Sequence, residues 1–271
     1  MTAKRIIITG AASGIAAATM AELKRSGADV VGLDINAEQE GLVRVDVRDQ
    51  SSVDAAVAEA VSRLGGVDVL INCAGVATPQ SAGLAPDARA HAVIDINLMG
   101  PWRVTSAALP ELRKSRGRVI NVASGMAFIG LPFATAYAMS KHGVVAYSQA
   151  LRLEHGDAIS VTTVYPGYID TPIQNDSREF GLSLGGSSPE ERMEDVVAAF
   201  VKAALGEKPI RNITTTKTGL VLNSISKHMP PVAERVVLAS LRKALRRQPM
   251  DNAAPPLIDF ARRLATGSRR Q

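Results

Sequence analysis

Short apolar segments alternate with alanine-rich segments along the first two-thirds of this 271-residue chain, and this alternation constrains the fold most strongly. We expect strands at 5–9, 29–34, 43–47, 67–72, 117–123 and 160–165, and helices near 14–26, 51–64, 87–115 and 134–155. Several of the strands are apolar almost throughout, as in a parallel sheet that helices cover on both faces. The pattern therefore predicts a single-domain α/β fold of the Rossmann type, with a doubly wound parallel sheet.

The turn after the first expected strand is rich in small residues. It reads Thr9-Gly10-Ala11-Ala12-Ser13-Gly14-Ile15-Ala16 and leads into the first expected helix. Glycine lets the backbone approach a phosphate, and a helix N-terminus offers free N–H groups and the positive end of the helix dipole. The turn therefore predicts a pyrophosphate site at Gly10, Ser13, Gly14 and Ile15, although an ordinary tight turn can carry the same glycines.

A carboxylate, Asp34, ends the second expected strand. In this position it can accept hydrogen bonds from the ribose hydroxyls of adenosine and repel a 2′-phosphate. No arginine lies at 11–13, and the next two residues are Ile35 and Asn36. The charge pattern favours NAD over NADP as cofactor; the alternative role of Asp34 is a strand-end cap.

The glycine turn and a second short motif resemble the short-chain dehydrogenase/reductase family. The glycine turn is similar to the family's Thr-Gly-x-x-x-Gly-x-Gly, with Ala16 at the last glycine, and Asn72-Cys73-Ala74-Gly75 is similar to its Asn-Asn-Ala-Gly. The resemblance covers residues 5–171 and loosens beyond them. It implies that Asn72, Ala74 and Gly75 steady the sheet and line the cofactor, and that Asp46 and Val47 flank the adenine.

Ser124, Tyr137 and Lys141 match the catalytic group of that family. Tyr137 and Lys141 are four residues apart on an expected helix and share one face, while Ser124 follows the fifth expected strand at its ligand-facing end. An unperturbed tyrosine has a pKa of about 10, which a neighbouring ammonium lowers. We expect Tyr137 to act as general acid and base, and Ser124 to polarise the substrate oxygen. A Tyr–Lys pair at this spacing is common on helices, so the assignment depends on its co-occurrence with the other motifs.

The resemblance assigns further residues by position. Asn97 corresponds to the family asparagine that kinks its helix and holds a water in a proton relay to the lysine. Pro166, Gly167, Ile169 and Thr171 lie in a segment similar to the one that wraps the nicotinamide, where Thr171 would bind the carboxamide. The resemblance thus implies an NAD-dependent oxidoreductase acting on CH–OH groups.

The substrate is expected to be an apolar secondary alcohol or ketone. Apolar side chains gather where the site would be covered: Met126, Phe128, Ile129, Leu131, Phe133, Ile173, Phe180, Leu182 and Leu184. Such residues favour a hydrophobic ligand, or they simply pack the loop against the body. The C-terminal layout is similar to that of relatives acting on retinoids, steroids and other lipid-like alcohols. A reductase of a small polar or acyl-type substrate and a non-catalytic NAD(H)-binding regulator are the alternatives.

Residues 1–250 are expected to form the dinucleotide-binding catalytic domain, with a substrate loop at 172–190 and a helical segment at 217–247, and 251–271 a basic tail. The net charge of +5 has much of its excess late in the chain. We interpret that end as a solvated helix face with a frayed tail. Contact with an anionic membrane surface is the minor alternative.

The remaining features predict the setting of the protein. The single cysteine, Cys73, excludes an internal disulfide and is typical of a reducing compartment, and no apolar run is long enough to cross a bilayer. We expect a cytoplasmic protein, and the resemblance implies a homodimer or homotetramer through the two long helices after the fourth and fifth strands. Four scattered histidines without ligand spacing predict no metal site, and basic clusters without interleaved aromatics predict no nucleic-acid binding.

Overall fold

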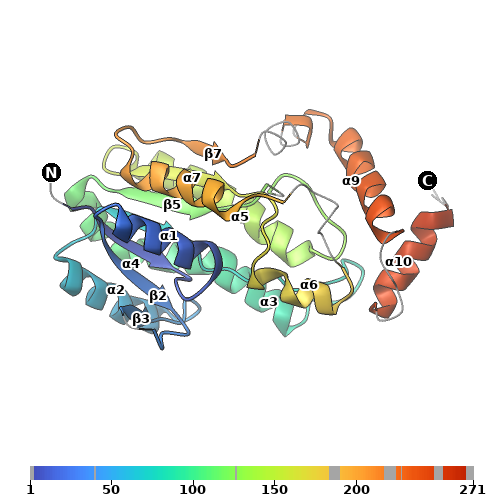
Figure 1. Ribbon diagram of the computed structural model, residues 1–271, viewed down its shortest axis with the longest axis horizontal. Helices are drawn as coiled ribbons and strands as arrows, with labels where there is room; N and C mark the ends of the chain where they lie inside the picture. Colours follow the sequence, from blue (N-terminus) through green and yellow to red (C-terminus); the bar gives the residue numbers. More distant parts are fainter. Residues whose placement is uncertain are drawn as a thin grey trace.

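A computed structural model describes residues 3–39, 41–125, 127–182, 190–216, 224–226, 228–246 and 253–266. One parallel sheet runs through it in the order β3-β2-β1-β4-β5-β6-β7 (Figure 1). The strands are β1 (Arg5–Thr9), β2 (Asp29–Asp34), β3 (Leu42–Arg44), β4 (Val69–Asn72), β5 (Arg118–Val122), β6 (Ser160–Tyr165) and β7 (Asn212–Thr214). The predicted α/β fold with a doubly wound parallel sheet is confirmed.

Helices cover both faces of this sheet. On one face, α1 (Gly14–Arg25) and α7 (Met193–Leu205) pack over an apolar cluster that includes Ile6, Ile8 and Phe200. On the other face, α2 (Gln50–Leu64), α4 (Gly100–Ser115) and α5 (Thr135–His155) enclose a second cluster. Because both faces are buried, several of the strands are apolar almost throughout, which explains why they can be recognised in the sequence.

The segment expected as one helix at 87–115 is divided into three parts. It consists of α3 (Ala88–Ile94), a π-helical turn η1 (Asp95–Met99) and α4. The π-turn contains Asn97, whose side chain bonds to the backbone of Val76 outside the helix. A π-turn widens a helix locally and is frequent at functional sites. The continuous helix was therefore a wrong expectation, and the interruption falls at Asn97, where the resemblance implies a kink.

Beyond β6 the chain is mostly helical. A short 3₁₀ turn η2 (Pro172–Gln174) and α6 (Asn175–Glu179) occupy the first part of the expected substrate loop, whose residues 183–189 lie outside the described part. The helices α9 (Pro230–Leu245) and α10 (Pro255–Thr266) lie to one side of the sheet (Figure 1). The helix α9 lies within the helical segment expected at 217–247, of which residues 217–223, 227 and 247 lie outside the described part.

The frayed C-terminal tail is a wrong expectation for residues 255–266, which form α10. Leu257 of α10 is fully buried in a cluster with Phe133, Leu182 and Leu245, against which Phe260 packs. The rings of Phe133 and Phe260 meet edge to face at 5.4 Å. Apolar residues on one face of this helix hold it in place while Arg262 and Arg263 remain exposed. Among the described residues, no helix is long and apolar enough to cross a membrane.

Candidate functional site

The order of the strands reverses between β1 and β4, since β2 and β3 lie on one side and β5 to β7 on the other. Ligands of open parallel sheets bind at the carboxyl ends of the strands on either side of such a switch point. A cleft of about 630 Å³ lies there. Most predicted site residues line this cleft: Gly10, Ser13, Gly14, Ile15, Asp34, Asp46, Val47, Ala74, Gly75, Ser124, Tyr137, Lys141, Pro166, Gly167, Ile169 and Thr171.

The glycine turn is held against the strand next to it. Gly10 has a φ of 76°, and a Cβ atom on it would lie 2.8 Å from the Cα atom of Ala74. The hydroxyl of Thr9 accepts the N–H groups of Cys73 and Ala74, both at 3.1 Å. The first turn of α1 begins at Gly14 in the same cleft. The backbone therefore forms a narrow cradle that has room for a phosphate and no room for a side chain at Gly10, which fits a dinucleotide.

Asp34 binds the glycine turn as well as lining the cleft. Its Oδ2 atom accepts the N–H of Ala12 at 2.9 Å, and its Oδ1 atom accepts the N–H of Asn36 at 2.9 Å. The strand-end cap left open as an alternative is therefore a real role of this carboxylate. Each oxygen keeps a further lone pair, so the group can still accept hydrogen bonds from a ligand in the cleft.

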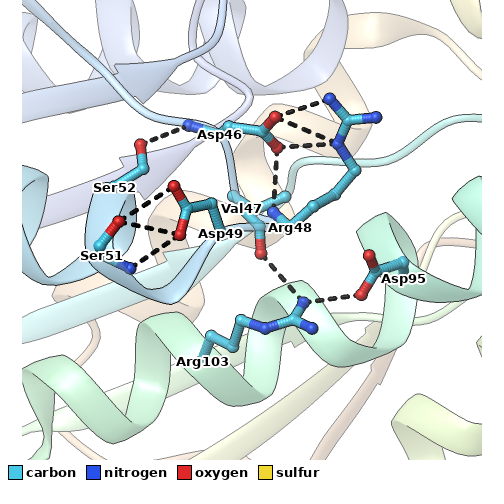
Figure 2. Close-up of polar contacts among 8 residues, drawn as sticks. All are labelled: Asp46, Val47, Arg48, Asp49, Ser51, Ser52, Asp95 and Arg103. Carbon is cyan, nitrogen blue, oxygen red and sulfur yellow. Dashed lines mark hydrogen bonds and ion pairs between the residues drawn. The ribbon is translucent and has the colours of Figure 1, made fainter.

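A polar network supports the cleft next to Asp46 (Figure 2). The guanidinium of Arg48 donates to Asp46 at 2.9 Å and 2.6 Å, and this hydrogen bonding holds the pKa of Asp46 below its usual range. Arg103 of α4 donates to the carbonyl oxygen of Val47 at 3.2 Å and to Asp95 at 2.7 Å. The network joins the loop after β3 to the π-turn that carries Asn97. Neither Arg48 nor Arg103 was singled out from the sequence, where nothing links them to the glycine turn.

Tyr137 and Ser124 meet at the inner end of the cleft. Tyr137 lies in the first turn of α5, and Ser124 is buried just after β5. Burial raises the pKa of Tyr137, and a hydrogen bond with Ser124 lowers it by a smaller amount. The lowered pKa expected from Lys141 is therefore not found: burial disfavours the phenolate more strongly than its neighbours favour it.

Lys141 is buried one helical turn beyond Tyr137. Its Nζ atom donates to the carbonyl oxygen of Val122 at 2.9 Å and lies 5.7 Å from the centre of the Tyr137 ring. Burial lowers the pKa of Lys141 to about 8. Lys141 is thus held at Val122, the last residue of β5, two positions before Ser124. It can change its charge near neutral pH.

Asn97 and Asn72 do not line the cleft. The side chain of Asn97 exchanges two hydrogen bonds of 2.8 Å with the backbone of Val76, and donates to Ser140 at 3.2 Å. It therefore joins the loop after β4, which contains Gly75 and Val76, to α5. Asn72 is buried in the sheet and donates to Thr105 and Asn121, both at 2.9 Å. Of the two roles implied for Asn72, steadying the sheet is thus the one its contacts fit, because its amide faces α4 and β5.

Further cleft residues besides Arg48 were missed in the sequence, among them Arg89, Gln174 and Asp176. Arg89 of α3 forms an ion pair with Asp176 of α6, and Gln174 lies between η2 and α6. This ion pair joins α6 to α3, and both of its members line the cleft. The two partners are 87 positions apart, so their spacing carried no signal.

The expected apolar cover is only partly present. Ile173 lines the cleft, but Phe133, Phe180 and Leu182 pack in the cluster with α10. Phe128 stacks on Tyr165 at 5.6 Å. Met126 and Leu184 lie outside the described residues. Most of these side chains therefore hold loops against the body, the second interpretation left open for them.

Other chemistry finds little support in the described part of the chain. Cys73 lines the cleft beside Ala74, but burial raises its pKa to about 11, so its thiol stays protonated at neutral pH. The described residues contain no group of three or more His, Cys, Asp or Glu side chains that could hold a metal ion.

Comparisons with known proteins agree with this geometry. The family model described as short chain dehydrogenase matches residues 4–181. The oxidoreductase UcpA of Salmonella typhimurium is 34% identical over 219 residues, covering 75% of this chain and 81% of its own. The 3-oxoacyl-[acyl-carrier-protein] reductase FabG of Thermotoga maritima is 35% identical over 217 residues, covering 72% and 88%. A short-chain dehydrogenase structure from Burkholderia cenocepacia in complex with NADP has a TM-score of 0.73 at 22% identity, covering 87% and 98%.

Proposed function

The chain belongs to the short-chain dehydrogenase family of oxidoreductases, and we propose that it transfers a hydride between NAD(H) and a secondary alcohol or ketone. The observation that carries the proposal is the meeting of Ser124, Tyr137 and Lys141 in the same cleft as the glycine cradle. Substrate and cofactor sites thereby share one space, as hydride transfer requires. A nicotinamide cofactor bound there would supply or accept the hydride.

The residues of this chain handle the proton. In the reducing direction, the hydroxyl of Tyr137 gives its proton to the substrate oxygen as that oxygen gains electrons. Ser124 donates a hydrogen bond to the same oxygen and stabilises its developing charge. The ammonium of Lys141, fixed by Val122, favours the phenolate that remains on Tyr137. In the oxidising direction the phenolate takes the alcohol proton back.

The proposed cofactor is NAD rather than NADP. Asp34 lines the cleft at the end of β2, and its negative charge would repel a 2′-phosphate. The nearest cleft arginine along the chain, Arg48, is engaged by Asp46. The Burkholderia protein was solved with NADP, so the preference for NAD depends on Asp34 in this chain.

The proposed substrate is hydrophobic, because Val76, Ile96 and Ile173 line the cleft. A reductase of acyl-type carbonyls is the second candidate, and the 35% identity to FabG of Thermotoga maritima favours it. Arg89 and Asp176 line the cleft and would place charged groups near such a substrate. Comparing rates with sterol and retinoid alcohols and with acetoacetyl thioesters would separate the two.

Trp102 and Leu153 support a homo-oligomer, a dimer or a tetramer, through α4 and α5. Trp102 is 55% exposed and stacks on Tyr147 at 5.6 Å, and Leu153 is 88% exposed. Large exposed apolar side chains on two neighbouring helices favour contact with a second copy.

The lone free thiol of Cys73 favours a cytoplasmic location.

The test of the proposed function follows the absorbance of the reduced nicotinamide with NAD or NADP and pooled secondary alcohols and ketones. We expect turnover with NAD that Tyr137→Phe abolishes while leaving NADH binding intact. Tyr147→Phe, on the same helix and outside the cleft lining, is the matched control and should retain turnover. Turnover with NADP alone would contradict the role of Asp34. NADH binding without turnover of any substrate would favour a regulatory protein instead.

A further inference from the structure

Pro166 and Gly167 form part of the wall of the cleft, and Glu191 lies behind this wall. Glu191 is in the segment that leads to α7. Its side chain is buried, with 9% of the residue exposed. Its Oε1 atom accepts the N–H of Gly167 at 2.9 Å, and its own N–H donates to the carbonyl oxygen of Tyr168 at 2.8 Å. The carboxylate of Glu191 thus binds the backbone of Gly167, a residue that lines the cleft.

Gly167 fits this contact because it has no side chain. A Cβ atom on Gly167 would lie 2.2 Å from Oε1 of Glu191, far inside contact distance. The residue before it is bound as well: the carbonyl oxygen of Pro166 accepts the N–H of Gly125 at 2.7 Å, and Gly125 follows Ser124. The wall is therefore held on one side by the turn after β5 and on the other by Glu191.

The second oxygen of Glu191 indicates that this carboxylate is not retained for stability alone. Oε2 is buried and has no hydrogen-bond partner among the described residues. A buried polar atom without a partner destabilises the folded state, so its presence calls for a compensating role. Thr215 is the other acceptor near Gly167, at the longer distance of 3.3 Å. Glu191 therefore makes the main contact to this N–H.

We propose that Glu191 is a positioning residue, which fixes Pro166 and Gly167 so that they present a rigid surface to the nicotinamide end of the cofactor. This inference rests on the proposed function, because it assumes a nicotinamide dinucleotide in the cleft. The adenosine end would lie against Asp34 and the glycine turn, which Glu191 does not contact. Loss of Glu191 should therefore weaken binding of the nicotinamide half and leave the other half unchanged.

The test compares NADH with ADP-ribose, which lacks the nicotinamide ring. Dissociation constants are measured by calorimetry for the wild type, Glu191→Ala, Glu191→Gln and the control Glu190→Ala, whose side chain is exposed next door. We expect Glu191→Ala to weaken NADH about tenfold, as for loss of a hydrogen bond to a charged group, and ADP-ribose less than about twofold. Glu191→Gln, whose amide oxygen can still accept from Gly167, should restore NADH binding to within about threefold.

Other outcomes have distinct meanings. Equal weakening of NADH and ADP-ribose in Glu191→Ala would overturn the positioning role in favour of a general structural one, and no weakening of either would also overturn it. If the alanine variant does not fold, Glu191→Asp keeps the charge but shortens the side chain by one methylene. It should weaken binding of NADH and leave binding of ADP-ribose unchanged. A wild type that binds ADP-ribose but gains nothing from the nicotinamide ring would overturn the proposed function itself, with the role of Glu191.

Discussion

The Nζ atom of Lys141 lies 5.7 Å from the centre of the Tyr137 ring; Lys141 is buried and Tyr137 is partly buried in the first turns of α5. Burial acts on the two groups in opposite senses: it raises the pKa of Tyr137 and lowers that of Lys141 to about 8. Both shifts favour the neutral forms. At neutral pH the tyrosine is therefore protonated, which is the form that donates a proton to a carbonyl.

The first prediction concerns the pH dependence of the two directions. Reduction needs the Tyr137 phenol, so kcat/KM for a ketone should be level at neutral pH and fall as pH rises through the pKa of Tyr137. Oxidation needs the phenolate, so kcat/KM for an alcohol should rise over the same range. Lys141 carries its charge below its pKa of about 8, so Lys141→Met removes the cation that favours the phenolate there and should lower kcat/KM for the alcohol below about pH 8. Profiles that are flat in both directions would contradict Tyr137 as the acid and base.

Asp34 gives a second prediction, because it serves both the glycine turn and the proposed ribose site. In Asp34→Asn the side chain has one acceptor oxygen in place of two and no charge, so either Ala12 or Asn36 loses its acceptor. We expect NADH affinity to fall by about tenfold, with NADPH affinity changing much less because repulsion of its 2′-phosphate is also removed. Dissociation constants for both cofactors would show this.

The control for Asp34 is Asp29→Asn, at the exposed opposite end of the same strand. It should leave both affinities unchanged. A large gain in NADPH affinity in Asp34→Asn, at unchanged NADH affinity, would mean that the carboxylate only excludes the phosphate and has no part in holding the turn.

The sequence was sufficient wherever the signal was local. The apolar strands, the glycine turn and the Tyr137–Lys141 spacing each involve neighbouring residues, and the structure places them as predicted. Contacts between distant segments could not be predicted in this way. The ion pair between Arg89 and Asp176 joins segments that no periodicity connects. The expected lowering of the pKa of Tyr137 failed for a related reason, because burial depends on the whole fold.

The C-terminal helix gives a third prediction. Leu257 of α10 is fully buried with Phe133, four residues before Tyr137, and with Leu182, just after α6. The N–H of Ala254 also donates to the carbonyl oxygen of Phe180 at 3.1 Å. Because α10 holds both loops, Leu257→Ala should lower the free energy of unfolding by about 2–4 kcal/mol and speed proteolysis around α6. Leu84→Ala, at a site 67% exposed and outside α4 and α5, is the control. Unchanged proteolysis would mean that α6 is held without α10.

A fourth prediction concerns assembly. Trp102→Glu places a charge on the exposed surface that α4 and α5 share, where Trp102 stacks on Tyr147. If a second copy covers this surface, light scattering should show a smaller assembly at unchanged fold. Met139→Glu, which changes another exposed side chain on α5, at 60% exposure, tests whether the surface extends toward the catalytic end. A wild type that is already monomeric would contradict the proposed oligomer.

The last prediction concerns stability at a site remote from the cleft. Asp68, before β4, accepts hydrogen bonds from the backbone and side chain of Arg5 at 2.9 to 3.1 Å, and these hold its pKa below the ordinary value of 3.8. A carboxyl whose pKa is lower in the folded state stabilises the fold above its unfolded pKa, and this contribution disappears as pH falls through the folded value. Asp68→Asn should therefore cost about 1 kcal/mol of unfolding free energy at pH 7.

In urea titrations, the difference between Asp68→Asn and the wild type should shrink steadily as the pH falls below about 4. The exposed Asp157, in the turn after α5, provides the control: Asp157→Asn should match the wild type both at pH 7 and below about pH 4. NADH binding should be unchanged in both variants, because neither residue lines the cleft. A difference that persists undiminished at low pH would show that Asp68 acts through packing and not through its charge, since protonation would then leave its contribution intact.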